Sequence, residues 1–334
     1  MELGVSVIIC CYNSAGRLPE TIKHLAEQQV PSRIPWEVIV INNASKDDTA
    51  NLAFEEWSKY NLADVNFTVE DQPIPGLIHA RKKGIEIARY EYLLFCDDDN
   101  WLNAHYISTA FTIMNSDKLI GVLGGCGIVE AEQPVHLSED LLKQTTVSGA
   151  QSWALTDHWV YGAGALYRKS ILVSLTNKGW EQITTGRTGS KLVSGEDVEI
   201  CFMIYLSGYK IIADDRLTFK HFVPLKRQST AFIIHMAFWL SYTNVLLNSY
   251  YAIIHKNKHP IKKNIDDWFW NISKTVIKQL ILQSCKSFKV WEKPTTEQKI
   301  AIQSIRGTFY GLLLNRKKIV THHYLIKNIL SSNN

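Results

Sequence analysis

The chain has 334 residues, and its 36 lysines and arginines against 32 aspartates and glutamates give a formal net charge of +4. Hydrophobic residues make up 46% of the sequence and charged residues 20%, a composition that supports a buried core and excludes a globally disordered chain. The small net charge argues against a dedicated nucleic-acid-binding protein.

Short β-branched runs alternate with helical patterns through the first hundred residues. The predicted strands cover residues 5–10, 36–41, 65–69 and 92–96, and the predicted helices cover 17–29, 47–60 and 77–89. Strands that alternate with helices predict a mostly parallel, Rossmann-like α/β sheet flanked by helices. Ligands bind such sheets at the carboxyl ends of the strands, so we searched the polar segments after each strand for functional residues.

The middle of the chain is less regular. We expect a Gly-rich strand at 120–127, a strand, turn and strand at 159–168, and a loop rich in Gly, Thr and Ser at 176–194. A helix is predicted at 196–206, and two short strands at 209–213 and 217–221. The acceptor of any transfer reaction is expected near the 176–194 loop, where Trp153, Trp159 and Trp180 are candidates for stacking on sugars.

From residue 228 onward the pattern is wholly helical, with helices predicted at 266–288, 296–314 and 318–331. Residues 1–227 hold 21 basic and 28 acidic residues, net −7, whereas residues 228–334 hold 15 basic and 4 acidic residues, net +11. We therefore expect two parts, an α/β domain at 1–227 and a basic, all-helical C-terminal extension at 228–334.

The extension has two features that bear on membranes. Residues 228–255 carry no charge and are long enough to span a bilayer. Ser241, Asn244 and Asn248 form a polar stripe, however, which favours a helix packed on the protein or lying in the membrane plane. Lysines among Trp268, Phe269 and Trp270 suit an anionic membrane surface, and a solvated helical face is the alternative.

Cysteine usage and the N-terminus point to the cytoplasm. None of the six cysteines belongs to a CxxC pair, so buried free thiols are expected rather than a zinc site or a disulfide framework. Glu2 stands where a signal peptide would have basic residues, and we expect no signal peptide.

Three consecutive carboxylates, Asp97, Asp98 and Asp99, follow the predicted strand at 92–96. Adjacent like charges repel unless a cation neutralises them, and hard oxygen ligands suit Mg²⁺ or Mn²⁺. An acidic turn in solvent is the alternative. The position after a buried strand favours the metal hypothesis.

Two further carboxylates, Glu196 and Asp197, open the predicted helix at 196–206. Acidic residues are common at helix N-termini, where the helix dipole stabilises them. The functional alternative is a general base that takes a proton from an acceptor hydroxyl.

Two other polar groups also follow predicted strands. Asn42 and Asn43 could bind a nucleobase edge or cap the next helix. His221 could be a third metal ligand, a phosphate donor or a packed structural residue.

These motifs together resemble those of the family-2 inverting nucleotide-sugar glycosyltransferases, which have the GT-A fold. The segments 5–14, 38–49, 97–100 and 195–197 occur in the family's order, and the resemblance covers about residues 3–227. The family's activity implies a nucleoside-diphosphate sugar donor, expected to be a UDP-sugar, and a glycan or lipid-linked acceptor in surface polysaccharide or lipopolysaccharide synthesis. It also implies a divalent metal and no nucleic-acid partner.

The resemblance assigns roles residue by residue. Asp197 would be the catalytic base, Glu196 would position sugar hydroxyls and Asp99 would ligate the metal. His221, a candidate from its position after the last strand, is expected as a further metal ligand. The residues implied in donor binding are Cys10, Tyr12, Asn13, Asn43, Arg81, Asp97, Asp98, Gly162 and Gly164.

The sequence departs from the family at Asn42 and Asn43, where Asp is common. An Asn amide accepts a hydrogen bond from uracil without charge assistance, so thymine or another base stays open. A sugar-1-phosphate nucleotidyltransferase and a non-catalytic carbohydrate-binding protein are the competing hypotheses. A dinucleotide-dependent dehydrogenase is disfavoured because no GxGxxG follows the first strand.

Overall fold

The computed structural model describes residues 1–134, 141, 146–187, 192–255, 265–287 and 294–332. The chain divides into two compact units. The first comprises Met1–Val135, Thr146–Asn177 and Ile200–Leu225, and the second comprises His136–Thr145, Lys178–Glu199 and Lys226–Asn334.

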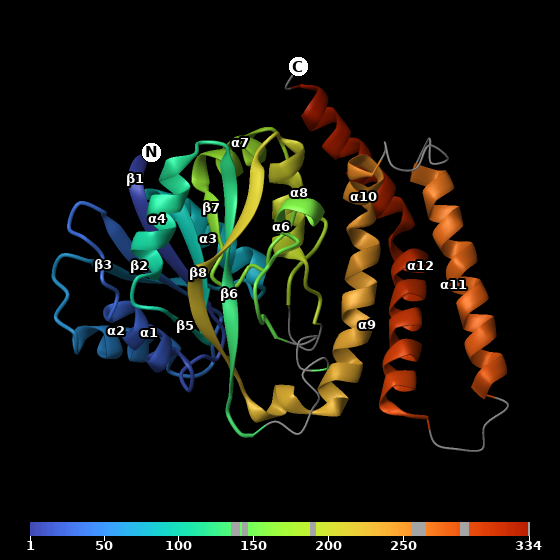
Figure 1. Cartoon of the computed structure of the whole chain (residues 1–334), viewed down its shortest axis with the longest axis horizontal. Helices are drawn as coiled ribbons and strands as arrows, with labels where there is room; N and C mark the ends of the chain where they lie inside the picture. Colours follow the sequence, from blue (N-terminus) through green and yellow to red (C-terminus); the bar gives the residue numbers. More distant parts are fainter. Residues whose placement is uncertain (135–140, 142–145, 188–191, 256–264, 288–293, 333–334) are drawn as a thin grey trace. The chain divides into compact units, whose positions relative to one another are not determined.

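The first unit is built on one sheet whose described strands lie in the order β3-β2-β1-β4-β7-β6-β8-β5 (Figure 1). The strands are β1 (Glu2–Cys11), β2 (Trp36–Asn43), β3 (Asn66–Gln72), β4 (Tyr90–Asp97), β5 (Asn100–Leu102), β6 (Ile120–Ala131), β7 (Leu166–Arg168) and β8 (Lys210–Val223). Strands β1 to β4 pair in parallel, whereas β7 is antiparallel to β4 and to β6. Strand β8 is parallel to β6 and antiparallel to β5.

Helices connect and cover these strands. They are α1 (Leu18–Ala26), α2 (Thr49–Ser58), α3 (Leu77–Ile87), α4 (Tyr106–Ser116), α6 (Ala154–Asp157) and α7 (Lys169–Asn177). Helix α8 (Glu196–Leu206) begins in the second unit and ends in the first. The predicted fold class, a mostly parallel α/β sheet flanked by helices, is confirmed.

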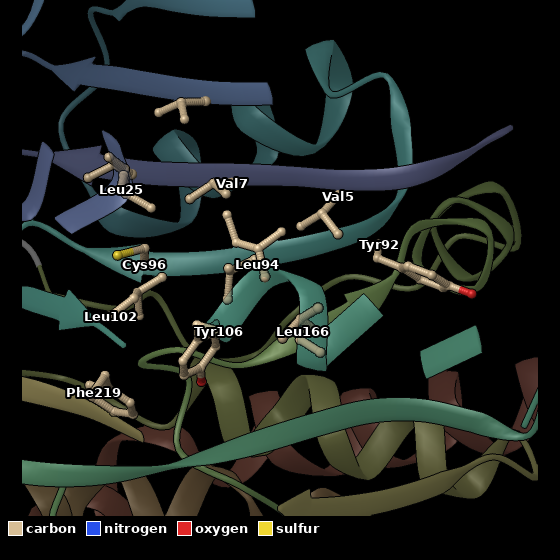
Figure 2. Close-up of a cluster of buried hydrophobic side chains, with 14 of the residues drawn as sticks. Val5, Val7, Leu25, Tyr92, Leu94, Cys96, Leu102, Tyr106, Leu166 and Phe219 are labelled. Atoms are coloured by element: carbon tan, nitrogen blue, oxygen red, sulfur yellow. The ribbon is translucent and has the colours of Figure 1, made fainter. Parts of the chain in front are cut away.

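The core of the first unit explains why its strands read as continuous apolar runs. Val5, Val7 and Ile9 on β1 are fully buried, as is Leu94 on β4, because helices cover the sheet. Tyr106 from α4 is buried in the same cluster (Figure 2).

Two predictions about the middle of the chain were wrong. The strand expected to begin at 159, before the turn at 162–164, is not formed. The Tyr161 N–H donates to the Gln151 side chain (2.7 Å) instead of to a neighbouring strand. The two strands expected at 209–213 and 217–221 are one strand, β8. The pairing of β8 with β6 shifts register between Gly124↔Ala213 and Cys126↔Thr218. The polar residues at 214–216, which suggested a break between two strands, lie within this irregular part of β8.

The second unit is helical over its C-terminal part. Its elements are η1 (Leu225–Gln228), which begins at the boundary of the first unit, α9 (Thr230–Leu246), α10 (Asn248–Ile254), α11 (Ile265–Ser287) and α12 (Thr296–Ser331). Helix α12 packs against α9 and α11 (Figure 1). The two helices predicted at 296–314 and 318–331 are therefore one, because no glycine or proline interrupts the chain between them.

Close packing of α12 on α9 depends on two glycines. A Cβ atom on Gly307 would lie 2.1 Å from the Phe238 carbonyl oxygen, and one on Gly311 would lie 3.0 Å from Val245. This small-xxx-small spacing lets the two helix backbones approach each other directly. The Asn315 side chain adds a hydrogen bond to the Tyr242 hydroxyl (2.9 Å).

No single described helix is long and apolar enough to cross a membrane. Helices α9 and α10 reach that length and composition together, but they are bent by 51° where they meet. The five cysteines whose side chains are described, Cys10, Cys11, Cys96, Cys126 and Cys201, are free thiols. The lysines at 256, 258, 262, 263 and 289, and the side chains of Trp268, Cys285 and Lys286, lie outside the description.

Candidate active site

The loops after β1 and β2 are joined at the carboxyl edge of the sheet. Asn13 adopts a left-handed backbone conformation (φ 51°), its N–H donates to Ser45 Oγ (3.0 Å), and its Oδ1 accepts from the Lys46 N–H (2.8 Å). Neighbouring Tyr12 is 48% exposed, which leaves its ring open to a ligand. Cys10 lies opposite Asp97 in the β1–β4 pairing. The residues of this segment that were predicted to bind the sugar donor, Cys10, Tyr12 and Asn13, therefore lie near the ends of β1 and β4.

Asn42 and Asn43 have different environments. Asn43 is buried, and its Nδ2 donates to the carbonyls of Gln72 (3.1 Å) and Ile74 (2.7 Å), while its Oδ1 accepts from the Gly76 N–H (2.8 Å). These bonds give it a structural role in shaping the 72–76 loop. Asn42 donates to Asp71 (2.8 Å), and its buried Oδ1 has no hydrogen-bond partner among the described residues. The acceptor atom without a described partner is therefore on Asn42 rather than on Asn43.

Asp98 is the most strongly held carboxylate of the triplet. It accepts hydrogen bonds from Ser14 Oγ and from the Arg17 guanidinium, whose Nη2 lies 2.5 Å from Oδ2. Thr21 Oγ1 donates to the Asp98 carbonyl (3.0 Å). Burial raises the pKa of Asp98, and the charge of Asp99 raises it further, whereas Arg17 opposes both effects. The β1–α1 loop is thus joined to the end of β4 by a partly buried ion pair.

Asp99 faces His221 across the β5–β8 side of the sheet. The distance from Asp99 Oδ1 to His221 Nε2 is 3.8 Å, and both side chains are buried. His221 Nδ1 accepts a hydrogen bond from the Val147 N–H (3.0 Å), so in the neutral ring the proton is on Nε2, directed toward Asp99. The Asp99 backbone is fixed as well, since its carbonyl accepts from the Phe222 N–H (2.8 Å).

Arg81 comes from α3 and is buried against β4. Its guanidinium carbon lies 5.0 Å from the centre of the Phe95 ring, two residues before Asp97 on the strand. A buried cation held on an aromatic face is suited to an anionic group such as a diphosphate.

The turn at Gly162–Gly164 closes over the end of β4. The Gly164 N–H donates to the Phe95 carbonyl (2.9 Å), and the Tyr106 hydroxyl donates to the Gly164 carbonyl (2.6 Å). Gly164 has φ 69°, and a Cβ there would lie 2.7 Å from the Tyr106 hydroxyl oxygen. The position therefore requires glycine, because the Tyr106 and Phe219 side chains fill the space that a side chain would need.

The residues at this edge fit a divalent ion whose coordination shell is completed by water and by the substrate. Asp97 is partly exposed, Asp99 is buried beside His221, and Asp98 is held by Ser14 and Arg17. Within the described ranges, no group of three or more His, Cys, Asp or Glu side chains is arranged to hold a metal. Mg²⁺ commonly takes one or two carboxylates and fills its shell with water and phosphate oxygens, which matches this donor set.

Glu196 and Asp197 belong to the second unit, where they open α8. Gly195 precedes them with φ 90°, and a Cβ there would lie 2.9 Å from a Thr243 methyl carbon. Asp197 Oδ1 accepts from the Val198 N–H (2.8 Å), and the Glu196 carbonyl accepts from Gln182 Nε2 (2.9 Å). Their predicted catalytic roles stay predictions.

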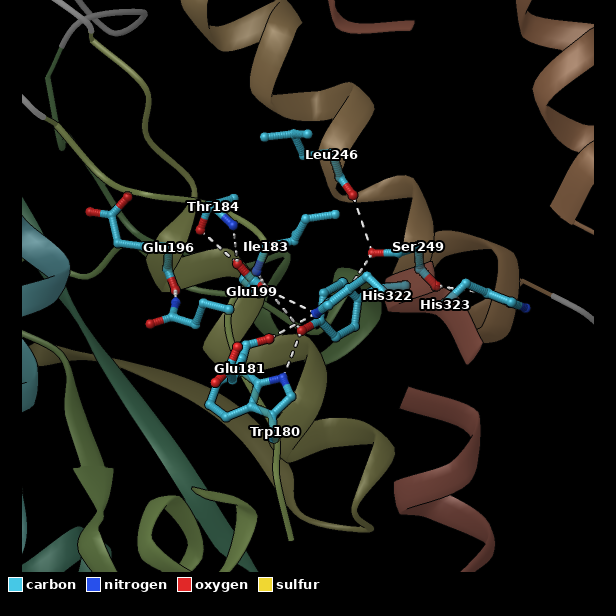
Figure 3. A network of polar contacts seen from close by, with 12 residues as sticks. Trp180, Glu181, Ile183, Thr184, Glu196, Glu199, Leu246, Ser249, His322 and His323 are labelled. Atoms are coloured by element: carbon cyan, nitrogen blue, oxygen red, sulfur yellow. Dashed lines mark hydrogen bonds and ion pairs between the residues drawn. The ribbon is translucent and has the colours of Figure 1, made fainter. Parts of the chain in front are cut away.

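Glu199, one turn further along α8, is the centre of a buried polar network (Figure 3). Its Oε1 accepts from the Ile183 N–H (2.6 Å) and the Tyr250 hydroxyl (2.9 Å). Its Oε2 accepts from the N–H (2.9 Å) and hydroxyl (2.6 Å) of Thr184. The Trp180 indole N–H donates to the Tyr250 oxygen (2.9 Å). Burial raises the pKa of Glu199 to about 7 despite these donors.

Helix α12 holds the same loop from a second direction. Lys318 Nζ donates to the Ile183 carbonyl (2.8 Å), and His322 Nε2 lies 2.9 Å from the Glu181 carbonyl oxygen. Burial lowers the pKa of His322 to about 4. The 180–184 loop is thus fixed between the first turn of α8 and the C-terminal helices.

Sequence reasoning missed Arg17, Ser14 and Glu199. Arg17 and Ser14 had a signal, because they lie in the polar segment directly after the first strand. Glu199 had a weaker signal, because it is one of three acidic residues in the first turn of α8 and nothing in the sequence separates it from Glu196 and Asp197.

Comparison with known proteins identifies the family. A family model described as glycosyl transferase family 2 matches residues 6–175, about half of the chain. The chain belongs to glycosyl transferase family 2. It is therefore a glycosyltransferase, and the family expected from the ordered motifs is confirmed.

Individual relatives are distant. The poly-beta-1,6-N-acetyl-D-glucosamine synthase of Staphylococcus epidermidis is 22% identical over 225 residues, which cover 66% of this chain and 50% of the synthase. The chain thus spans about half the length of that relative. The putative glycosyltransferase EpsH of Bacillus subtilis is 33% identical over 102 residues, 30% of this chain and 28% of EpsH.

A solved structure shares the fold. The mannosyltransferase PcManGT from Pyrobaculum calidifontis, in complex with GDP-Man and Mn²⁺, superposes with a TM-score of 0.50 and 16% identity. The match covers 100% of this chain and 76% of that one. The GT-A-type fold implied by the resemblance is thereby confirmed.

Proposed function

We propose that this glycosyltransferase moves a sugar from a nucleoside-diphosphate donor, most simply a UDP-sugar, to a hydroxyl of a glycan or lipid-linked acceptor. The observation that carries the proposal is the convergence at the end of β4, where Asp98 pairs with Arg17 and Asp99 lies beside His221. Family membership supports it, as do the names of the relatives, a polysaccharide synthase and a mannosyltransferase crystallised with GDP-Man. Membership of glycosyl transferase family 2 favours this proposal over the two competing hypotheses, a sugar-1-phosphate nucleotidyltransferase and a non-catalytic carbohydrate-binding protein.

Donor binding is divided among the residues at this edge. The buried Oδ1 of Asn42, which has no described partner, would accept the imide N–H of the base once the donor reaches it, while Asn43 shapes the adjacent loop. Arg81 would neutralise part of the diphosphate charge, and Gly162 and Gly164 stay predicted donor residues.

The reaction would be a single in-line displacement. The acceptor oxygen forms a bond to the anomeric carbon as the bond from that carbon to the β-phosphate oxygen breaks. The acceptor proton passes to the Asp197 carboxylate, and the nucleoside diphosphate leaves with the bonding electrons. Attack from the face opposite the leaving group inverts the anomeric carbon. Holding both substrates in line supplies much of the rate.

Asp97 and Asp99 would hold a divalent metal, Mg²⁺ or Mn²⁺, which when bound neutralises charge on the departing diphosphate. His221 stays a predicted ligand. Its Nδ1 is taken by the Val147 N–H, and its Nε2 lies 3.8 Å from Asp99 Oδ1, close enough for both side chains to face one metal ion.

The basic helices suggest where the enzyme works. A cytoplasmic enzyme on the inner membrane surface would meet a lipid-linked acceptor, as in building polysaccharide or lipopolysaccharide units. The excess of 15 basic over 4 acidic residues in 228–334 supports attraction to anionic lipid.

The first experiment is a panel of nucleotide sugars, screened for metal-dependent thermal stabilisation and then for transfer. Asp197→Asn should keep donor binding and abolish transfer, and exposed Asp48→Asn is the matched control. Asp99→Ala should lose metal dependence and diphosphate affinity together. Full transfer by Asp197→Asn, or a retained anomeric configuration in the product, would contradict the scheme.

A further inference from the structure

The second unit has an exposed surface of mixed apolar and basic character, which we call the aromatic–basic face. Its apolar members are Trp270 and Ile277 on α11, and Phe309, Tyr310, Leu313 and Leu314 on α12. Leu313 and Leu314 are 65% and 66% exposed, and Trp270 is 54% exposed. Apolar side chains this exposed, clustered on adjacent helices, indicate an interaction surface rather than isolated exceptions.

Helical spacing makes the α12 residues one face. Phe309 and Leu313 are four residues apart, as are Tyr310 and Leu314, so each pair lies along one side of the helix. The face continues to α11, because the Arg316 guanidinium carbon lies 5.3 Å from the centre of the Trp270 ring.

Basic side chains border these apolar residues. Lys274 and Lys278 follow Trp270 on α11 at intervals of four and eight residues, and both are exposed. Arg306 and Lys317 flank the apolar stretch of α12 and are also exposed. No acidic residue lies among the described exposed positions of α12 between Arg306 and Lys327.

We infer that the aromatic–basic face docks on an anionic lipid bilayer, with the leucines and aromatic rings inserted at headgroup depth and the cations paired with lipid phosphates. Aromatic and leucine side chains beside lysine and arginine are the composition of helices that lie in a membrane interface. A second copy of the chain is the less suitable occupant, because it would bring two positively charged faces together. The inference deepens the proposed function by assigning the surface that brings the enzyme to a lipid-linked acceptor, and it rests on that proposal.

The test is flotation of the full chain with vesicles. Phosphatidylcholine–phosphatidylglycerol vesicles at low salt should carry the protein, whereas phosphatidylcholine alone should not. Leu313→Ser combined with Leu314→Ser should weaken binding about tenfold, because the inserted apolar area is lost. The control is Leu155→Ser, a leucine that is 64% exposed on α6.

Charge is tested separately. Lys274→Gln and Lys317→Gln should each weaken binding about fivefold, and exposed Lys118→Gln should change nothing. If high salt does not weaken the vesicle binding of these variants, pairing of the lysines with lipid phosphates is contradicted.

The inference is overturned if the chain fails to float with anionic vesicles, or if the leucine variant floats as well as the wild type. It is also overturned if sedimentation shows a dimer that the leucine variant loses, because the face would then join two copies. Sugar transfer to a soluble acceptor is measured in vesicle-free buffer, so its absence would refute the proposed reaction without affecting the flotation result.

Discussion

The buried carboxylate of Glu199 makes a pH-dependent prediction for the substitution Glu199→Gln. Burial raises the pKa of Glu199 from 4.5 to about 7, so between these values the folded chain binds a proton that the unfolded chain releases. The stability that this proton contributes is present below pH 4.5 and is lost as the pH rises through 7. A shift of this size corresponds to about 3 kcal/mol of unfolding free energy.

Glutamine keeps the volume of Glu199 but does not titrate. The NH₂ group of the glutamine would face two of the donors that the carboxylate now accepts from, which come from Ile183, Thr184 or Tyr250. Leaving these donors unpaired would lower the free energy of unfolding by about 1–3 kcal/mol, and this loss does not vary with pH. The variant should therefore be less stable than the wild type at pH 4.5. It should lose that disadvantage, or become the more stable chain, by pH 8.

The assay is urea unfolding of both chains from pH 4.5 to 8, reported as the difference between their unfolding free energies. Nearby His322, whose pKa is lowered to about 4, lies 3.6 Å from Glu199 (Nε2 to Oε1), so Glu199→Gln is compared in the wild-type chain and in a His322→Gln background to separate the two groups. Exposed Glu55→Gln is the control. A difference that stays constant over this range would refute the reasoning, since the four donated hydrogen bonds would then outweigh burial.

Two further substitutions test the packing described above. Gly307→Ala should destabilise the chain by about 1–3 kcal/mol, because its Cβ would lie 2.1 Å from the Phe238 carbonyl oxygen. The control Gly16→Ala, where nothing lies within 4 Å of the added Cβ, should be nearly neutral. Equal thermal unfolding midpoints for the two variants would contradict this account. Arg17→Met should cost about 2 kcal/mol, a value reduced because Arg17 is 31% exposed, and should lower donor affinity by freeing Asp98. Unchanged stability and affinity together would show that this pair does not hold the site.

The sequence predicted the fold where one local pattern decides the structure. The strand at 92–96 is buried on both faces and is followed by three carboxylates, and it emerged as β4 with little change of bounds. Prediction failed where a distant contact decides. Residues 159–161 have strand-like composition, yet the Gln151 side chain takes the N–H that a neighbouring strand would have bonded.

The candidate site shows the same limit. Asp98 was predicted from its neighbours in the chain, but its partners Ser14 and Arg17 lie more than eighty residues away, and only the β1–β4 pairing brings them together. Nothing in the sequence separates the environments of Asn42 and Asn43, and only Asn43 is among the residues implied in donor binding. Their difference arises because one side chain meets the 72–76 loop and the other meets Asp71.

The continuity of α12 links two properties that the sequence kept apart. Leu313 and Leu314 stand on the exposed face, and Lys318 and His322, a turn or two further along the same unbroken helix, hold the 180–184 loop. The residues proposed to meet the bilayer and the residues that hold the loop therefore belong to one helix, so transfer as well as flotation should be measured for the leucine variant.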